Sequence, residues 1–297
     1  MNELVGRQNF ILGSYFNLTR DLTLRATDSF AYDRNTSSGG SQPFTVGRQL
    51  SWVNTFGPGA RWQFTPRASL DVSALYEVRR FIGSGSGIDS DTYTLDTALG
   101  YALTPRFTGT AGYGFTYIDT TGEESSTTHY PHLGLTYAIT PSLSLSISGG
   151  PAITQIGGET DISPAGSVNL IQQLRYGSIN AEYTRGVSVA GGFGGTTDTQ
   201  RVALTLALTR LVRNMVFFVT PSYTNSQSIS NLQATQVDVE AYAISLGATY
   251  RVTNYFYIFA GYDYLRQRTG GASTLHVDAD QNRVKVGLQF GYPLNFN

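Results

Sequence analysis

Apolar and small polar residues alternate strictly over residues 133–147, which read LGLTYAITPSLSLSI. A period of two places successive side chains on opposite faces of a β-strand. Thr140-Pro141 interrupts the alternation, and proline favours a turn because its φ is fixed and it donates no backbone hydrogen bond. The segment is therefore predicted to be a β-hairpin with one apolar and one polar face.

The same two-strand unit recurs along the chain. Its other copies lie at residues 12–24, 60–72, 99–111, 204–219 and 246–258, with a weaker copy at 168–181. Successive turns lie roughly 35 to 45 residues apart, a spacing typical of repeated supersecondary units. Neighbouring hairpins pair edge to edge, and closing such a sheet removes its exposed edges. We therefore expect an all-β, antiparallel, up-and-down transmembrane β-barrel.

The pattern predicts fifteen strands joined by two kinds of connection. Tight turns follow the odd-numbered strands, and loops rich in Gly, Ser, Thr and Asp follow the even-numbered ones, at 33–46, 82–91, 120–127, 155–165, 190–196, 228–234 and 268–281. Short turns at one rim and longer loops at the other are typical of outer-membrane barrels. The strands are expected near residues 9–18, 22–32, 47–64, 67–80, 92–103, 107–119, 128–139, 142–154, 166–175, 178–189, 197–210, 214–227, 235–250, 255–267 and 282–292.

An odd strand number conflicts with the even number found in bacterial single-chain barrels. Either a first strand precedes Met1, or two strands are merged or one is missed in the pattern. We favour a further strand before Met1 and a parent barrel of about 16 strands. The first residues lack the basic start and apolar stretch of a signal peptide, which agrees with a trimmed chain. Neither a composition shift nor a linker divides the chain, so residues 1–297 are predicted to form a single outer-membrane barrel domain.

The two faces of the predicted strands differ in chemistry. The apolar faces are nearly uncharged, as in Val202, Leu204, Leu206 and Leu208, whereas the opposite faces carry Ser, Thr, Gly, Ala, Arg and Gln. A lipid-facing exterior and a wet lumen explain this difference. Asp28 is the exception, because it falls on the lipid face of the second strand.

Aromatic residues cluster at the predicted strand ends, where girdles at the two membrane boundaries would place them. The turn-side set is Trp62, Phe64, Tyr101, Phe107, Tyr137, Tyr176, Tyr250 and Tyr255, and the loop-side set is Tyr32, Tyr93, Tyr117 and Tyr130. The general preference of Tyr for strands is the alternative explanation.

Composition narrows the class of protein further. Charged residues make up 14% of the chain and aromatic residues 12%, while the mean hydropathy is only −0.14. No apolar run approaches the roughly 20 residues of a membrane-spanning helix. The net charge of −1 shows no excess of basic residues of the kind that binds nucleic acid. The absence of cysteine excludes disulfides, thiolate metal sites and cysteine nucleophiles.

The predicted lumen is lined by charged residues of both signs. This candidate site consists of Arg25, Arg61, Arg67, Asp71, Glu77, Arg79, Asp96, Arg175, Glu182, Arg201, Asp263, Arg283 and Lys285. Such charges either tune ion selectivity or pair with one another and brace the wall. The excess of cations predicts a mild anion preference or an unselective polar pore. Tyr257 and Phe259 are scattered inward candidates rather than the continuous aromatic track of a sugar channel.

The connections are short for a constriction loop folded into a porin lumen. A barrel this wide with nothing inside should be filled with water. We therefore expect an open lumen, with something outside this chain, such as a partner subunit, as its plug or gate.

Catalytic and metal-binding patterns are weak. His129 and His132 point to opposite faces of one strand, which excludes a shared metal ion. His276, Asp278 and Asp280 alternate in a loop and form at most a candidate cation site. The Gly83–Gly87 run resembles a phosphate loop but no helix follows it. We predict no catalytic residue, no metal ion and no cofactor.

The recurring motif resembles the β-barrel porin type 2 group of outer-membrane proteins. It stands here as LGLTYAITPSLSLSI, LGYALTPRFTGTA, GARWQFTPRASLDV and LGATYRVTNYFYIF, and residues 174–183, LRYGSINAEY, are also similar. The resemblance spans nearly the whole chain and implies a link to exopolysaccharide export. It carries over no catalytic motif.

Three functional hypotheses follow. The first is a porin-like channel that passes or exports a hydrophilic solute through the bacterial outer membrane, in contact with membrane lipid and lipopolysaccharide. The second is a sheath or anchor whose lumen houses a periplasmic or lumenal partner protein. The third and weakest is a barrel hydrolase, for which Ser144, Ser146 and Ser148 lie on the strand that pairs with that of His132.

Overall fold

The protein folds into a single layer of fifteen β-strands, seen here in a computed structural model. The structure describes residues 8–33, 44, 49–83, 87–190, 192–209, 211–229, 233, 235–271, 273 and 276–290. Within this part of the chain there is no helix long and apolar enough to cross a membrane. The strands are β1 (Gln8–Asn17), β2 (Leu22–Asp33), β3 (Leu50–Trp62), β4 (Ala68–Ile82), β5 (Ser90–Thr104), β6 (Phe107–Thr120), β7 (Ser126–Thr140), β8 (Leu143–Ile156), β9 (Glu159–Leu174), β10 (Gly177–Ala190), β11 (Gly194–Leu208), β12 (Met215–Ser228), β13 (Asp238–Arg251), β14 (Phe256–Thr269) and β15 (Ala279–Phe290).

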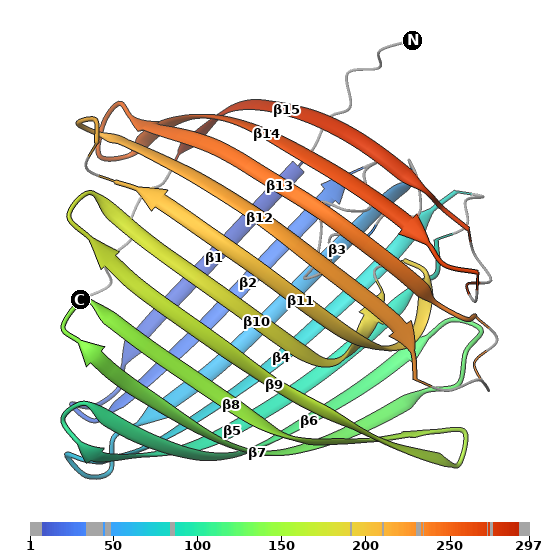
Figure 1. The fold of residues 1–297 in the computed structure, drawn as a ribbon, viewed down its shortest axis with the longest axis horizontal. Coiled ribbons are helices and arrows are strands. Elements are labelled where there is room, and N and C mark those ends of the chain that lie inside the picture. The colour runs from blue at the N-terminus through green and yellow to red at the C-terminus, as the bar shows by residue number, and fades with distance from the viewer. Residues whose placement is uncertain are drawn as a thin grey trace.

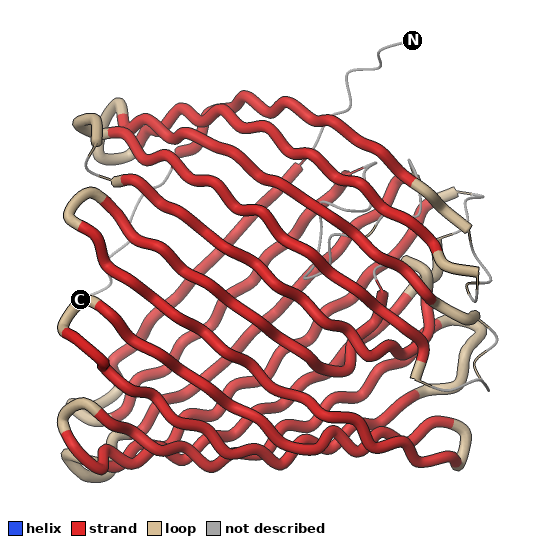
Figure 2. The backbone as a smooth tube through the Cα atoms, viewed as in Figure 1, coloured by secondary structure: helices blue, strands red, loops and turns tan. Residues whose placement is uncertain are grey.

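Each strand pairs antiparallel with the next, so the order in the sheet is the order in the chain. The sheet curls round so that β1 to β4 lie behind the later strands, and strand accounts for nearly all of the backbone (Figures 1 and 2). The fold class expected from the sequence is therefore confirmed. A strand of 14 residues such as β6 is about 48 Å long and rises roughly 36 Å at a tilt of about 40°, enough to cross an apolar band of about 25 Å.

The strand register fixes which residues share a face. Leu135 lies opposite Ile147, which lies opposite Val168, and this row faces outward. The inward row beside it contains Thr136, Ser146 and Asn169. Large apolar side chains remain exposed on the outward face, for example Leu133, Leu204 and Ile244. The predicted separation of an apolar outer face from a polar inner face is thus present in the register.

A threonine hydroxyl organises several of the tight turns. Thr65 Oγ1 accepts hydrogen bonds from the backbone N–H groups of Arg67 and Ala68 at 3.2 and 2.9 Å. Thr140 does the same for the N–H groups of Ser142 and Leu143 at 3.3 and 3.0 Å. Such side-chain-to-backbone bonds stabilise turns in the place of ladder bonds. This explains the repeated threonine in the turns of the sequence pattern.

The expected loop at residues 155–165 is wrong. Strand β9 begins at Glu159, and only Gly157 and Gly158 separate it from β8. Their φ angles of 57° and 86° match the two-residue hairpin turn that requires a positive φ at both central positions. Pro164 suggested a loop, because proline donates no ladder hydrogen bond, but it lies within β9 opposite Pro151.

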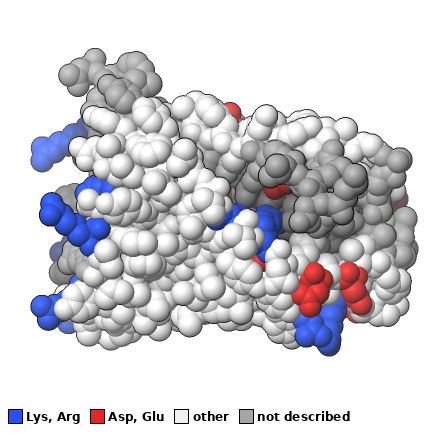
Figure 3. All heavy atoms as spheres, turned by 90° about the horizontal axis from the view of Figure 1, so that it is seen from above, with Lys and Arg blue, Asp and Glu red and all other residues white. Residues whose placement is uncertain are grey.

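Aromatic side chains form contacts on the outward face near both rims. Tyr93 stacks on Tyr76 towards the loop side, with ring centroids 4.7 Å apart, and Phe107 contacts Tyr137 at the turn side. Tyr130 was expected in the loop-side girdle, which is wrong, because its register places it on the inward face with His132. Figure 3 shows Lys and Arg gathered at the turn-side end, on the left, then a largely uncharged band, and a second group of charged residues of both signs towards the right.

Candidate functional site: the lumen wall

Most of the predicted lumen residues lie on one face of the sheet. Register and alternation place on the inward face Arg25, Arg61, Asp71, Glu77, Arg79, Asp96, Glu182, Arg201, Asp263, Arg283 and Lys285. Arg67 and Arg175 lie in the tight turns before β4 and β10 rather than on the strands. The role of all these residues in lining a pore remains a prediction.

The first charged cluster spans strands β2 to β4. Arg25 Nη2 donates to Asp71 Oδ1 at 2.7 Å and crosses β3 to reach it. The crossing is possible because Gly59 of β3 lies below the arginine, and a Cβ atom at that position would be 2.7 Å from Arg25 Nε. Arg61 lies directly opposite Asp71 in the register. One carboxylate therefore lies between two guanidinium-bearing positions.

A second charged cluster lies on β13 to β15. Ser245 Oγ donates to Asp263 Oδ1 at 3.0 Å, and Lys285 forms an ion pair with the same carboxylate. Arg283 lies opposite Asp263. The side chains of Lys285 and Asp263 remain 31% and 26% exposed, so this pair contributes on the order of 0–1 kcal/mol to stability. Its main effect is to place one positive and one negative charge next to each other on the wall.

A third pair lies closer to the loop-side rim. Arg79 Nη2 and Glu77 Oε1 are 3.4 Å apart on the inward face of β4. Only 3% of Arg79 is exposed. A guanidinium buried this deeply requires compensation by charge or hydrogen bonds, so we assign Arg79 to bracing of the wall rather than to contact with a solute.

The wall formed by β6 to β9 has a different character, with many hydroxyl groups. Its hydroxyls bond across strands, in the pairs Thr128–Thr154, Thr136–Ser146 and Ser148–Ser167 at 3.0, 3.0 and 2.8 Å. Tyr130 and His132 stack on this wall with centroids 4.8 Å apart. The lumen thus has a charged side and a largely uncharged, hydroxyl-rich side.

The loop-side mouth of the lumen is occupied by the chain itself. Phe193 and Phe44 are fully buried and pack with the inward-facing Val239, Ala241 and Leu265. The β10–β11 hairpin, drawn in yellow, bends into the interior at its loop-side end (Figure 1). We call residues 192–197 the lumen cap. The expectation of an unobstructed lumen is therefore wrong.

Hydrogen bonds attach the lumen cap to elements on several sides. Thr196 Oγ1 donates to Ser126 Oγ of β7 at 2.7 Å. The side-chain amide of Gln233 accepts from Thr196 N–H and donates to Thr196 C=O, both at 2.9 Å. The backbone N–H of Ile88 donates to the carbonyl of Gly192 at 3.0 Å. Contacts between segments this distant in sequence fix the cap across the mouth.

The short length of the β10–β11 connection does not by itself predict the lumen cap. The run Gly191-Gly192-Phe193-Gly194-Gly195 contained a signal. Gly192, Gly194 and Gly195 adopt φ angles of 93°, 78° and 69°, which glycine tolerates without steric cost. The glycines allow the backbone to bend sharply on both sides of Phe193. This bend directs the Phe193 ring into the apolar cluster at the mouth of the lumen.

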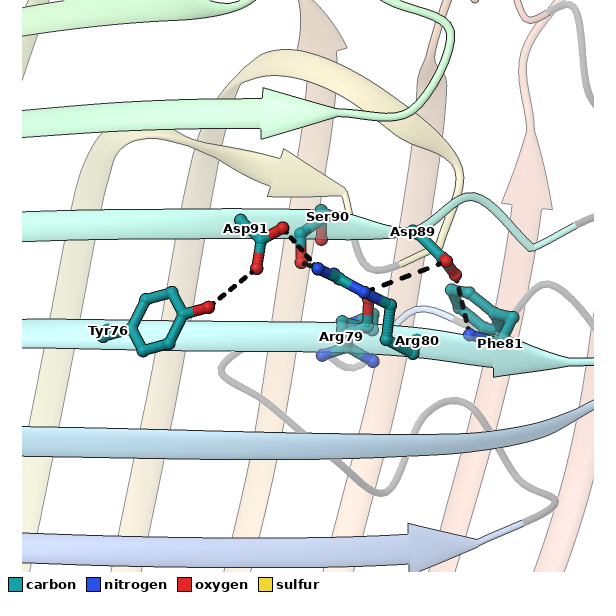
Figure 4. A network of polar contacts seen from close by, with 7 residues as sticks. All are labelled: Tyr76, Arg79, Arg80, Phe81, Asp89, Ser90 and Asp91. Atoms are coloured by element: carbon teal, nitrogen blue, oxygen red, sulfur yellow. Dashed lines mark hydrogen bonds and ion pairs between the residues drawn. The ribbon is translucent and has the colours of Figure 1, made fainter.

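A network of polar side chains lies at the loop-side ends of β4 and β5, where the apolar band of the outward face ends (Figure 4). Arg80 forms an ion pair with Asp91 and donates from Nη1 to the carbonyls of Arg79 and Ser90 at 2.9 and 3.0 Å. Tyr76 donates from its hydroxyl to Asp91 at 3.1 Å. Because these partners come from both strands, the network joins β4 to β5 and has a structural role at the rim.

The candidate chemical sites from the sequence are not assembled. His129 faces outward, where its Nδ1 is 2.6 Å from the hydroxyl of Tyr113, and His132 faces inward. Asp278 accepts from the N–H of Thr269 at 2.8 Å. Over the residues that the structure describes, no three His, Asp or Glu side chains are grouped so as to hold a metal ion.

Comparisons with known proteins identify the fold and not a family. No known family and no curated protein matches the chain. Among solved structures, it is similar to the FrpB iron transporter of Neisseria meningitidis, with a TM-score of 0.53, 10% identity, and 92% of this chain and 53% of that one covered. Pseudomonas aeruginosa FpvA, bound to pyoverdine, matches with a TM-score of 0.51, 9% identity, and coverage of 97% and 52%. A complex of FpvAI with pyocin S2 gives a TM-score of 0.50 at 9% identity, with coverage of 97% and 54%.

The chain spans about half the length of each of these receptors. The similarity therefore concerns the barrel wall, and the iron compounds and the pyocin belong to those other proteins. The fold is that of bacterial outer-membrane β-barrels, in agreement with the localisation predicted from the sequence. The resemblance to the porin type 2 group remains a resemblance.

Proposed function

We propose that this chain forms a channel in the bacterial outer membrane for a hydrophilic solute, with the lumen wall as its functional site. The observation that carries the proposal is the separation of the two faces. The outward face exposes Leu, Ile, Val and Phe side chains, and the inward face carries ion pairs and, separately, many hydroxyl groups. A protein whose apolar residues formed an interior would have the reverse arrangement. A polar wall suits passage of a hydrated molecule.

Export of an exopolysaccharide is the specific form of this function that we propose. It is supported by the sequence resemblance to the porin type 2 group and by the many hydroxyl and amide groups of the lumen. The outward face would contact membrane lipid, and its loop-side rim would contact lipopolysaccharide.

Planar-bilayer recording of the purified chain tests the channel. We expect discrete, ohmic conductance steps, with a small preference for chloride over potassium. A barrel that inserts, as shown by protection of its strands from protease, but conducts no current under any voltage would contradict the channel.

A second candidate function is a sheath whose lumen houses a partner protein. The lumen cap favours it, because part of the mouth on the loop side is occupied by the chain itself. Under this hypothesis conductance is absent, and a periplasmic protein that co-purifies with the barrel occupies the lumen from the turn side. Conductance of the barrel alone separates the two hypotheses.

A further inference from the structure

Aromatic rings lie on the lumen wall of β12 to β14, towards the turn side. The register forms an inward-facing row from Phe218 through Gly247 and Gly261 to Lys285. The next row towards the turns contains Phe259 of β14 with Gly287 of β15 opposite it. The two phenylalanines thus lie in adjacent rows, each beside a glycine of the neighbouring strand.

Both rings lie along the wall rather than projecting towards the barrel axis. A Cβ atom at Gly247 would overlap the ring of Phe218, and one at Gly287 would overlap the ring of Phe259. The rings therefore extend across the backbone of the next strand. Phe218 is still 37% exposed, so part of its apolar surface faces the lumen.

Polar groups border these rings on both sides. On the loop side the register places the row Thr220, Ser245, Asp263 and Arg283. Lys285 lies opposite Gly261 and forms an ion pair with Asp263. On the turn side Tyr257 lies opposite Gln289. Flat apolar surface is thus surrounded by hydrogen-bond donors and acceptors.

This combination fits the chemistry of a sugar ring. A pyranose has faces of C–H groups, which stack on aromatic rings, and a rim of hydroxyl groups, which bond to carboxylate, hydroxyl, amide and ammonium groups. Removing apolar surface from water is worth about 25 cal/mol of free energy per Å². A ligand stacked on an exposed phenylalanine ring would gain part of this free energy. A small inorganic ion would use the charged groups but leave the rings unused.

We propose that Phe218, Phe259 and Tyr257 form a stacking subsite for pyranose rings of a saccharide chain, oriented by Asp263 and Lys285. The subsite depends on the proposed channel only for the route by which the saccharide arrives. It gives the proposed saccharide solute a binding site at named residues of the lumen wall.

Isothermal titration calorimetry on the full chain in detergent tests the subsite. The probes are a linear glucose hexasaccharide, which is neutral, and a galacturonic acid hexasaccharide, which is acidic. We expect at least one of them to bind, and Phe218→Ala or Phe259→Ala to weaken binding about tenfold, in line with the energy of one aromatic contact. The matched control is Phe217→Ala, because Phe217 is the outward-facing neighbour on β12 and should leave binding unchanged.

The Phe218→Leu variant serves as a second test in case Phe218→Ala fails to fold. It keeps apolar bulk over Gly247 and removes the aromatic face, so it separates stacking from simple coverage of the backbone. Unchanged binding in Phe218→Leu and Phe259→Leu, or no binding of either hexasaccharide to the wild type, overturns the proposal.

Conductance of the same preparation separates this result from the function of the barrel. Conductance without saccharide binding refutes the subsite and leaves the channel. Saccharide binding without conductance refutes the channel and leaves the subsite.

Discussion

Long inward-facing side chains in this barrel lie over glycines of the neighbouring strand. Arg25 crosses Gly59, Phe218 crosses Gly247, and His132 would overlap a Cβ atom at Gly112. In each case the glycine provides space for a close approach rather than a special backbone angle. The side chains therefore follow the wall, which leaves room for water along the barrel axis.

Arg201 tests whether the inward cations set the selectivity of the channel. It lies on the inward face of β11, where a positive charge raises the local concentration of anions. We expect Arg201→Gln to lower the chloride-to-potassium permeability ratio, measured as the reversal potential across a potassium chloride gradient.

The matched control is Arg185→Gln on the adjacent strand. Arg185 lies on the outward face and pairs with Asp198, with Nη2 and Oδ2 2.7 Å apart, so its loss should leave the reversal potential unchanged. If both variants shifted the potential equally, the assignment of faces would not explain selectivity.

At the scale of the strand, the alternation of faces has an energetic consequence. Ile147 of β8 faces outward and is 39% exposed, and Ser146 beside it faces inward. We expect Ile147→Arg to destabilise the barrel by about 2–4 kcal/mol, because a cation then enters hydrocarbon. Ser146→Arg should cost far less. Urea unfolding in lipid vesicles measures both, and equal costs would contradict a lipid-facing Ile147.

The lumen cap makes a prediction for the β10–β11 hairpin. Thr196 and Ser126 have hydroxyls 2.7 Å apart, and the chain contains no cysteine, so a Ser126→Cys/Thr196→Cys variant forms one defined disulfide. If the cap must move to admit solute, we expect the oxidised variant to conduct less than the wild type and the reduced variant to recover.

Each single-cysteine variant serves as the control for the lumen cap, because it cannot form the crosslink. Replacing the anchor by Phe193→Ser should have the opposite effect and raise the open conductance. Equal currents from the oxidised and reduced double variant would show that the cap does not obstruct the conducting path.

The elements were predictable from sequence where alternation and turn chemistry agreed. Each of the fifteen expected strands has a counterpart in the same order, with ends that differ by a few residues at several of them, and a threonine side chain bonds to the backbone in the Thr-Pro turns. The pattern failed where a local signal opposed it: Pro164 and Gly166 concealed the first part of β9. The inward fold of Phe193 depends on contacts with distant segments, which no local pattern contains.

At the scale of the whole molecule, the two edges of the sheet constrain how it can close. Strands β1 and β15 both run from the loop side to the turn side, because consecutive strands alternate in direction and both are odd-numbered. A direct seam between them would therefore be parallel, whereas one further strand would give an antiparallel seam. Either way the edges must be paired in a membrane, since unpaired backbone groups in hydrocarbon cost several kcal/mol each.

The curled sheet also predicts how the whole protein behaves outside a membrane. Its outward wall exposes many large apolar side chains, among them Leu133, Val202, Leu204 and Tyr242, and soluble monomers rarely expose contiguous apolar patches beyond a few hundred Å². We expect the purified chain to aggregate on dilution out of detergent and to remain monodisperse in it, as measured by light scattering after size exclusion. A sharp monomer peak in plain buffer would mean that this wall is covered by protein. The lumen, its charged clusters and the saccharide subsite would then all require a different explanation, because each depends on water lying on the opposite side of the sheet.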